Sequence, residues 1–143
     1  MEQEKKLSLD IVTPYVRIVF AKVDEVNVPG SEGDFGVLPE HTPFLSSLRP
    51  GVLSYRQQRD VHYFAVSTGF VEVLPDRVIV LLQAGEDASK VSEKRAQDSK
   101  ERALRRLESA AKGDQQVDVK RAELSLARAD ARLRACACHK VKR

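Results

Sequence analysis

Residues 61–82 read VHYFAVSTGFVEVLPDRVIVLL and contain three strand patterns in succession. Residues 61–66 and 69–74 mix apolar and polar side chains at period two, which is typical of half-buried strands. Residues 77–82 form a nearly continuous apolar run that suits a buried strand. Pro75-Asp76 supplies a turn before that run. This stretch therefore predicts β structure throughout.

The strand pattern recurs on the N-terminal side of that stretch. Apolar and polar residues alternate in three further segments: 7–11, 23–28 and 51–55. Turn residues lie between the segments: Pro29-Gly30, Pro50-Gly51 and Gln58-Arg59-Asp60. Short strands at intervals of about 8–12 residues predict an antiparallel β sandwich or barrel, in which each strand buries one face.

Composition divides the 143-residue chain in two. All eight aromatic residues and all six prolines lie before residue 76. Residues 1–85 carry 8 Lys/Arg against 11 Asp/Glu, a net −3, whereas residues 86–143 carry 16 against 10, a net +6. We therefore expect a mildly acidic β domain over residues 1–85 and a basic domain over residues 86–143. A basic domain suits an anionic partner, or simply a solvated helix face.

Several classes of protein are disfavoured by the sequence. No apolar run approaches the ~18 residues that span a bilayer, so we expect no membrane insertion. The charged N-terminus is not followed by a long apolar stretch, so we expect no signal peptide. The two cysteines make no disulfide framework, which favours a reducing cytosol.

The basic domain has the pattern of two helices. Apolar positions step by three or four along one stripe: Val119, Ala122, Leu126, Ala129, Leu133 and Ala137. Residues 88–111 are strong helix formers, with Ala96, Ala103, Leu107 and Ala110 on one face. Gly113 suits the C′ position of the first helix, and Asp118 or Asp114 suits the N-cap of the second. The short link predicts an antiparallel helical hairpin.

The contact stripe of this hairpin is mostly alanine. A buried methylene is worth about 0.8 kcal/mol, so alanine in place of leucine at several positions forfeits several kcal/mol of docking energy. Helices that form well but pack weakly suit an element that changes its arrangement. A static hairpin remains equally compatible with the pattern.

No catalytic constellation is evident in the sequence. Neither the phosphate-loop pattern nor G-x-G-x-x-G occurs. The glycines Gly30, Gly33 and Gly36 are interpreted as a wide turn between strands. His41 and His62 have no cysteine or second histidine nearby. We therefore expect no enzyme activity.

The terminal residues Cys136, Cys138 and His139 offer three metal ligands where a closed site wants four. A frayed helix end accounts for them better, so we expect no metal.

The arginines of the basic domain share helix faces. Arg95 and Arg102 are seven residues apart, and Arg121, Arg128 and Arg132 step by seven and four. Such a cluster suits phosphates or carboxylates, although by spacing alone a solvated surface accounts for it better. Nucleic acid is disfavoured, because the aromatic residues all lie in the other domain.

Five ordered motifs resemble the epsilon subunit of F-type ATP synthases. Residues 28–43 (VPGSEGDFGVLPEHTP) resemble its glycine loop and P-x-H segment. The other motifs are similar to its K/R-P-G turn, its S-x-G-F-x-E-V strand and its two helical R-A signatures: residues 48–51, 67–73, 94–96 and 120–124. The resemblance runs from about residue 7 to residue 133.

The resemblance implies an N-terminal antiparallel β sandwich followed by a C-terminal helical hairpin. It implies a central-stalk rotor subunit that has no catalytic role, in a proton-translocating complex peripheral to the cytoplasmic face of the cell inner membrane. The β domain would bind the gamma subunit and the c-subunit ring. The hairpin would fold against the β domain, or extend along gamma and inhibit ATP hydrolysis. Proton and sodium coupling both remain open, because the ion site lies in other chains.

Site residues also follow from the resemblance. Glu32, Asp34 and His41 lie in the segment that faces the c ring in this family. Some members bind regulatory ATP through an I/L-D-x-x-R-A motif and later arginines, and Arg95, Arg102, Arg128 and Arg132 fall at the arginine positions.

The acidic position of that motif is Ser92, and Glu93 would point about 100° around the helix. A lost charged hydrogen bond costs about 1.5–3 kcal/mol, so we expect weak ATP binding or none.

In the extended state, Arg121, Arg128 and Arg132 would lie near acidic segments of the alpha/beta catalytic head. The alternative to a rotor subunit is a stand-alone β-sandwich binding module whose basic hairpin grips an anionic ligand.

Overall fold

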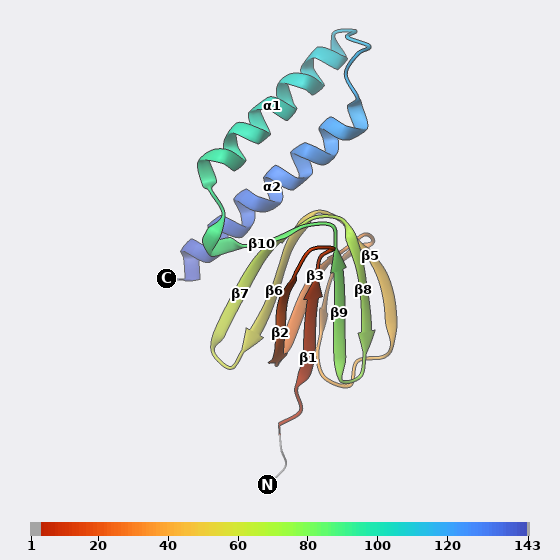
Figure 1. The fold of residues 1–143 in the computed structure, drawn as a ribbon, viewed down its shortest axis with the longest axis vertical. Helices are drawn as coiled ribbons and strands as arrows, with labels where there is room; N and C mark the ends of the chain where they lie inside the picture. The colour runs from red at the N-terminus through yellow and green to blue at the C-terminus, as the bar shows by residue number, and fades with distance from the viewer. Residues whose placement is uncertain (1–3, 143) are drawn as a thin grey trace.

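The structure, a computed structural model, describes residues 4–142. A β sandwich comes first and a hairpin of two helices follows it (Figure 1). The first five strands are β1 (Leu7–Val12), β2 (Arg17–Val23), β3 (Glu25–Gly30), β4 (Gly33–Val37) and β5 (Phe44–Leu48). The next five are β6 (Gly51–Gln57), β7 (Asp60–Val66), β8 (Gly69–Leu74), β9 (Arg77–Leu82) and β10 (Gly85–Asp87). A 3-10 turn, η1 (Ala88–Lys90), leads into α1 (Glu93–Ala111) and α2 (Val119–Lys142).

The strands follow one continuous hydrogen-bonded path, β10-β7-β6-β3-β5-β8-β9-β1-β2, and β4 pairs with β3. All pairs are antiparallel except β1 with β9. The predicted β sandwich followed by a helical hairpin is thus confirmed. The expected wide glycine turn is wrong, because residues 33–37 form β4 and Gly30 pairs with Gly33 in a tight hairpin. Gly33 has φ +134°, a conformation that glycine adopts readily.

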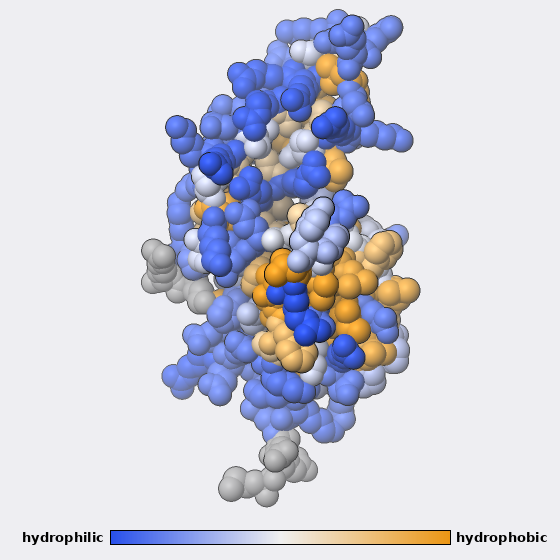
Figure 2. All heavy atoms as spheres, in the orientation of Figure 1, coloured by the Kyte–Doolittle hydropathy of each residue, from blue (hydrophilic) through white to orange (hydrophobic). Residues whose placement is uncertain are grey.

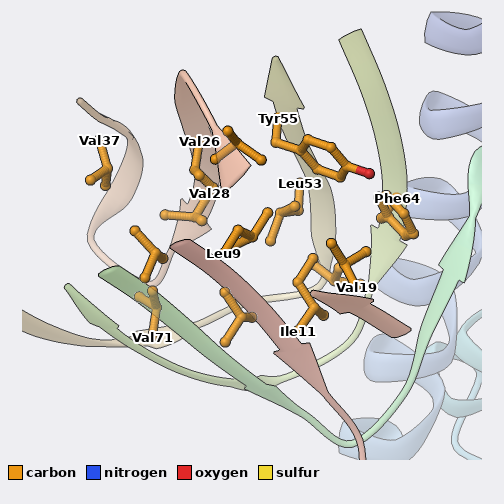
Figure 3. Close-up of a cluster of buried hydrophobic side chains, with 14 of the residues drawn as sticks. Leu9, Ile11, Val19, Val26, Val28, Val37, Leu53, Tyr55, Phe64 and Val71 are labelled. Carbon is orange, nitrogen blue, oxygen red and sulfur yellow. The ribbon is translucent and has the colours of Figure 1, made fainter. Parts of the chain in front are cut away.

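Large aliphatic side chains from most strands meet between the two layers of the sandwich. Figure 3 shows Leu9 and Ile11 of β1 directed toward side chains of β3 and β6, with Leu53 among them. Leu9, Ile11 and Leu53 are fully buried. Strands β8 and β9 approach closely at Gly69, where a Cβ would lie 2.1 Å from the carbonyl oxygen of Leu81. The glycine of the predicted strand motif is therefore required by packing.

The hairpin packs through alanines. Ala96 and Ala103 of α1 and Ala122 and Ala129 of α2 are almost fully buried, as predicted for that face. The ends of the predicted stripe differ, because Val119 and Ala137 are exposed. The first helix also begins later than expected, because residues 88–90 form η1 and Ser92 caps α1.

Among the described residues, the main contact of the hairpin with the sandwich is made by α2. Helix α2 contacts β6, β7 and η1, and α1 packs on the far side of α2 (Figure 1). A second buried face of α2 makes this contact, where Ala135 packs with Ala65 of β7 and Ala88 of η1. Strand β10 pairs with β7 and joins the two parts. None of the helices within residues 4–142 combines the length and apolarity needed to cross a membrane.

Candidate functional site

The hairpin carries a groove walled by arginines. Arg102 and Arg106 come from α1, and Arg128 and Arg132 come from α2. The groove has a volume of about 260 Å³, and its remaining lining is Ser99, Ala103, Ser125 and Ala129. We call it the arginine groove. The small alanine and serine side chains let the helix backbones approach closely, which brings the four guanidinium groups together.

The chemistry of the arginine groove suits an anion. Four arginine residues and no acidic residue line the groove. Ser99 Oγ accepts a hydrogen bond of 3.0 Å from Arg102, which orients one of the four. The planar donors of arginine match the oxygens of phosphate. The groove can therefore hold a phosphate-bearing ligand.

A second pocket of about 290 Å³ adjoins the arginine groove and shares Arg128 and Arg132 with it. It lies between α2 and the sandwich, and strand and loop residues complete its lining: Ala65, Val66, Ser67, Ala84, Gly85 and Glu86. Arg132 Nε donates to Glu86 Oε2 at 3.1 Å across this pocket. One arginine therefore serves both the groove and the contact that docks the hairpin.

The structure brings three of the four predicted nucleotide-binding arginines together. Arg102, Arg128 and Arg132 line the arginine groove, but Arg95 does not. Arg106 was missed, although its spacing of four residues from Arg102 placed it on the same helix face. Arg121, predicted as an inhibitory contact with Arg128 and Arg132, is exposed in the first turn of α2 and lies outside the groove.

Ser92 has a structural role at the start of α1. Its Oγ accepts a hydrogen bond of 3.3 Å from the backbone N–H of Arg95, which is the geometry of an N-cap. Serine and aspartate are equally good N-caps, so serine at the acidic position of the family's motif preserves the start of the helix. It removes a negative charge that the helix dipole favours at this end.

The candidate c-ring residues lie on the β3–β4 hairpin and on the loop after β4. Glu32 is exposed at the tip of the β3–β4 hairpin, and Asp34 forms an ion pair with Arg49. His41 lies between β4 and β5, where its Nδ1–H donates to the carbonyl oxygen of Thr42 at 2.7 Å. Among these three groups, Asp34 is already neutralised by a neighbour.

The C-terminal thiols lie on different sides of α2. Cys136 is buried and Cys138 is half-buried. Within residues 4–142, no group of three or more His, Cys, Asp or Glu side chains is placed to hold a metal. Nearby, the contact of Lys140 with Glu93 joins the end of α2 to the start of α1 and raises the pKa of Lys140.

The exposed side of strands β5, β8, β9, β1 and β2 is unusually apolar. We call it the outer face. Phe20, Leu45, Phe70 and Leu81 expose 68%, 69%, 59% and 52% of their surface there. Figure 2 shows hydrophobic residues gathered on the sandwich, whereas the hairpin is mostly hydrophilic. A contiguous apolar surface of this kind marks a contact site for another protein.

One charged pair lies within the outer face. Asp10 is 4% exposed, and Arg17 reaches both of its carboxylate oxygens at 3.0 Å. The Arg17 guanidinium also lies over the Phe20 ring, 4.6 Å from its centroid. Sequence reasoning missed this pair, because a polar residue in an alternating strand is normally solvated.

Fold and site together define a class: a β-sandwich protein with an antiparallel helical hairpin docked through one helix. Two family descriptions match the chain: "ATP synthase, Delta/Epsilon chain, beta-sandwich domain" over residues 6–88, and "ATP synthase, Delta/Epsilon chain, long alpha-helix domain" over residues 91–137. The chain belongs to the ATP synthase delta/epsilon family. The resemblance drawn from the five sequence motifs is thereby confirmed.

Relatives of known identity agree with this assignment. The chain is 44% identical over 130 residues to the ATP synthase epsilon chain of Syntrophobacter fumaroxidans, covering 91% of this chain and 95% of that one. It is 45% identical over 131 residues to the epsilon chain of Nitratidesulfovibrio vulgaris, with 92% and 96% covered.

A solved structure shares the fold. A chain in the cryo-EM structure of the Euglena gracilis mitochondrial ATP synthase superimposes with a TM-score of 0.80 at 20% identity, covering 94% of this chain and 82% of that chain.

Proposed function

We propose that this chain is a non-catalytic central-stalk subunit of a proton-translocating F-type ATP synthase. It couples rotation in the catalytic head to the c ring, and it is peripheral to the cytoplasmic face of the cell membrane. Residues 1–85 dock it to the rotor, and residues 86–143 regulate ATP hydrolysis. Its membership of the delta/epsilon family, across both the sandwich and the helices, carries this proposal.

Two surfaces of the sandwich are available for the two rotor partners. The outer face offers exposed Phe20, Phe70 and Leu81, which suit a broad apolar contact with the gamma subunit. The polar loops that carry Glu32, Asp34 and His41 suit the c-subunit ring. Ion pairing of Asp34 with Arg49 leaves Glu32 as the more available carboxylate of its hairpin.

The hairpin has the physical properties of a switch. Its contact with the sandwich is made by one helix and includes the small side chains of Ala131 and Ala135. Burial of small side chains gives little free energy, so release costs little. Arg121 and Arg128 are exposed already in the docked hairpin, and release also frees Arg132 from Glu86. The released hairpin can then carry all three arginines to acidic segments of the catalytic head. The hairpin then inhibits ATP hydrolysis.

Regulatory ATP binds this chain weakly or not at all. The arginine groove supplies donors for phosphates, but Ser92 is used as a helix cap and Arg95 lies outside the groove. Isothermal titration of the purified chain with ATP tests this point, and a submicromolar dissociation constant would contradict it. The Arg102→Gln variant is the control for any binding that is seen.

The decisive experiment measures ATPase activity of the assembled complex with and without residues 88–143. We expect higher ATP hydrolysis without the hairpin, because the inhibitory element is removed. The Arg121, Arg128 and Arg132 charge reversals in the full-length chain should relieve inhibition in the same direction. Unchanged hydrolysis in both cases would contradict the regulatory role.

Recovery of partners distinguishes a rotor subunit from a stand-alone binding module. The tagged chain should retain gamma and c-ring proteins from solubilised membranes. A module that grips an anionic ligand through the arginine groove would retain neither.

A further inference from the structure

Glu72 stands within the apolar outer face. It lies on β8, and its register neighbours on either side are Leu45 of β5 and Ile79 of β9. Phe70, two residues earlier, points to the same side of the sheet. The Glu72 side chain is exposed and makes no ion pair or side-chain hydrogen bond within residues 4–142. The outer face therefore presents an uncompensated carboxylate among apolar side chains.

Asp10 provides an internal comparison on the same face. It belongs to the same cross-strand row, because Ile79 is the register neighbour of both acids. Asp10 is buried, and Arg17 supplies it with a cation from within the chain that donates a hydrogen bond to Asp10 Oδ2. The two acids of this row thus differ in burial and in pairing: Asp10 is buried with a cation, and Glu72 is exposed without one.

Covering the outer face changes the energetics of Glu72. A carboxylate that loses water without gaining a cation or donors is strongly unfavourable. A partner that covers this face must therefore bring its own positive group to Glu72, draw Arg77 of β9 onto it, or leave Glu72 at the wet rim. The charge of Arg17 is already used by Asp10. Arg77 of β9 lies on the same side of the sheet, diagonally adjacent to Glu72, but it forms no ion pair with Glu72 within residues 4–142.

The surroundings of Glu72 favour a long basic side chain. A shallow groove of about 470 Å³ runs beside it, and Pro43, Phe44, Leu45, Val73 and Leu74 complete its lining. Lysine and arginine bury an aliphatic stem along apolar surface while the charged head stays with a polar group. The groove suits the stem, and the Glu72 carboxylate suits the head.

We propose that Glu72 is a specificity-determining residue of the outer face, where it accepts a charge-assisted hydrogen bond from one lysine or arginine of the gamma subunit. This inference rests on the proposed function, because that function supplies the partner. The surrounding apolar residues give contact area, and Glu72 selects the one register that places the basic side chain in the groove.

The test measures binding of the purified full-length chain to the gamma subunit of the same complex. Glu72→Leu and Glu72→Gln should each weaken binding by at least about tenfold, because the basic side chain of gamma is left without its partner. Phe70→Ala should also weaken binding, because it removes apolar contact. Asp60→Asn changes an exposed acid at the start of β7 and should leave binding unchanged.

Glu72→Leu weakens the binding of gamma if gamma supplies a cation to Glu72, and strengthens it if gamma supplies none. If gamma brings no cation, leucine removes a desolvated charge and binding becomes tighter, which overturns the inference. If both Glu72→Leu and Phe70→Ala leave binding unchanged, gamma does not cover the outer face; the inference falls and the proposed function stands. If the wild-type chain fails to bind gamma, the proposed function falls as well.

A double-mutant cycle identifies the basic residue. Lysine and arginine residues of gamma are replaced by alanine one at a time, and each variant is measured with wild-type chain and with Glu72→Leu. One gamma variant should weaken binding to the wild type and have no further effect on Glu72→Leu. Strictly additive effects at every position would reject a direct pair. Thermal unfolding of Glu72→Leu checks that the sandwich remains folded.

Discussion

The sandwich and the hairpin are both tightly packed, yet they are held together by very different amounts of apolar surface. The sandwich core buries leucine, isoleucine and valine from nearly every strand. The hairpin buries Ala96, Ala103, Ala122 and Ala129 between its helices. With about 0.8 kcal/mol per buried methylene, each leucine contributes far more than each alanine. Close packing and strong adhesion are therefore separate properties, and the hairpin has only the first.

The remaining contacts of the hairpin are ionic and partly exposed. Lys100 pairs with Asp130 between the helices, and Arg132 pairs with Glu86 of the sandwich. Such pairs contribute about 0–1 kcal/mol each and are weakened by salt. They orient the hairpin without fixing it, which is compatible with an element that docks and releases.

The largest expected effect lies in the sandwich core. Leu9→Ala removes a fully buried side chain and should lower the free energy of unfolding by about 2–5 kcal/mol, through lost burial and a cavity. Urea denaturation followed by circular dichroism measures this change. Leu45→Ala, at a position that is 69% exposed, is the matched control and should change stability by less than about 0.5 kcal/mol. Equal losses would show that the core is not the source of stability.

A leucine at the docking face of α2 tests the weak contact between the hairpin and the sandwich. Ala135 is 0% exposed where α2 meets the sandwich, so Ala135→Leu overpacks that contact by about 1–3 kcal/mol. We expect the hairpin to leave the sandwich while both parts stay folded. Amide hydrogen exchange should rise in α2 and stay low in β1 and β9.

Ala111→Leu is the control for that substitution, because Ala111 is exposed at the end of α1, on the helix that packs on the far side of α2. It should leave exchange unchanged. Loss of protection in the sandwich core of Ala135→Leu would contradict a separable hairpin, since the two parts would then unfold as one unit.

The strands that the sequence predicted well are those with one buried face. Residues 69–74 and 77–82 were placed correctly as β8 and β9. The expectation that residues 77–82 are a buried strand is wrong, because β9 alternates and Leu81 is 52% exposed. Strands β2, β4, β5 and β10 were missed. In β5, Phe44 and Leu45 are adjacent and both exposed, so no period-two pattern exists. A strand is recognised in a sequence by its alternation of buried and exposed residues, and two adjacent exposed apolar residues do not show that alternation.

The candidate site was also predicted in part. The seven- and four-residue spacings correctly placed Arg102, Arg128 and Arg132 together, because the alanine face of each helix fixed which sides meet. The second buried face of α2 was not predicted, because alanine occurs all around that helix and gives no contrast between faces. The pairing of Asp10 with Arg17 depends on cross-strand geometry that spacing alone does not contain.

A smaller effect is expected from the ion pair that docks the hairpin. Glu86→Gln removes the charge opposite Arg132 and should shift the docking equilibrium by at most about 1 kcal/mol. Fluorescence energy transfer between a label on α1 and one on β8 measures the docked fraction. The difference from wild type should shrink in high salt. Glu101→Gln, on the exposed side of α1, is the control, and a salt-independent difference would argue against an ionic contribution.

The smallest effect at neutral pH concerns Asp24, which follows β2. Hydrogen bonds from Lys6 and from the backbone of Gln58 hold the pKa of Asp24 below its usual value of 3.8. Because the folded pKa lies below the unfolded one, the stabilisation is complete at neutral pH. It is lost as the pH falls from about 4 through the folded pKa. Asp24→Asn should therefore be less stable than wild type at pH 7, and the two should converge in acid, as measured by urea denaturation at each pH. Asp76→Asn, in the exposed β8–β9 turn, should show no such convergence. A deficit of Asp24→Asn that persists unchanged at pH 2.5 would locate its origin in packing instead of charge.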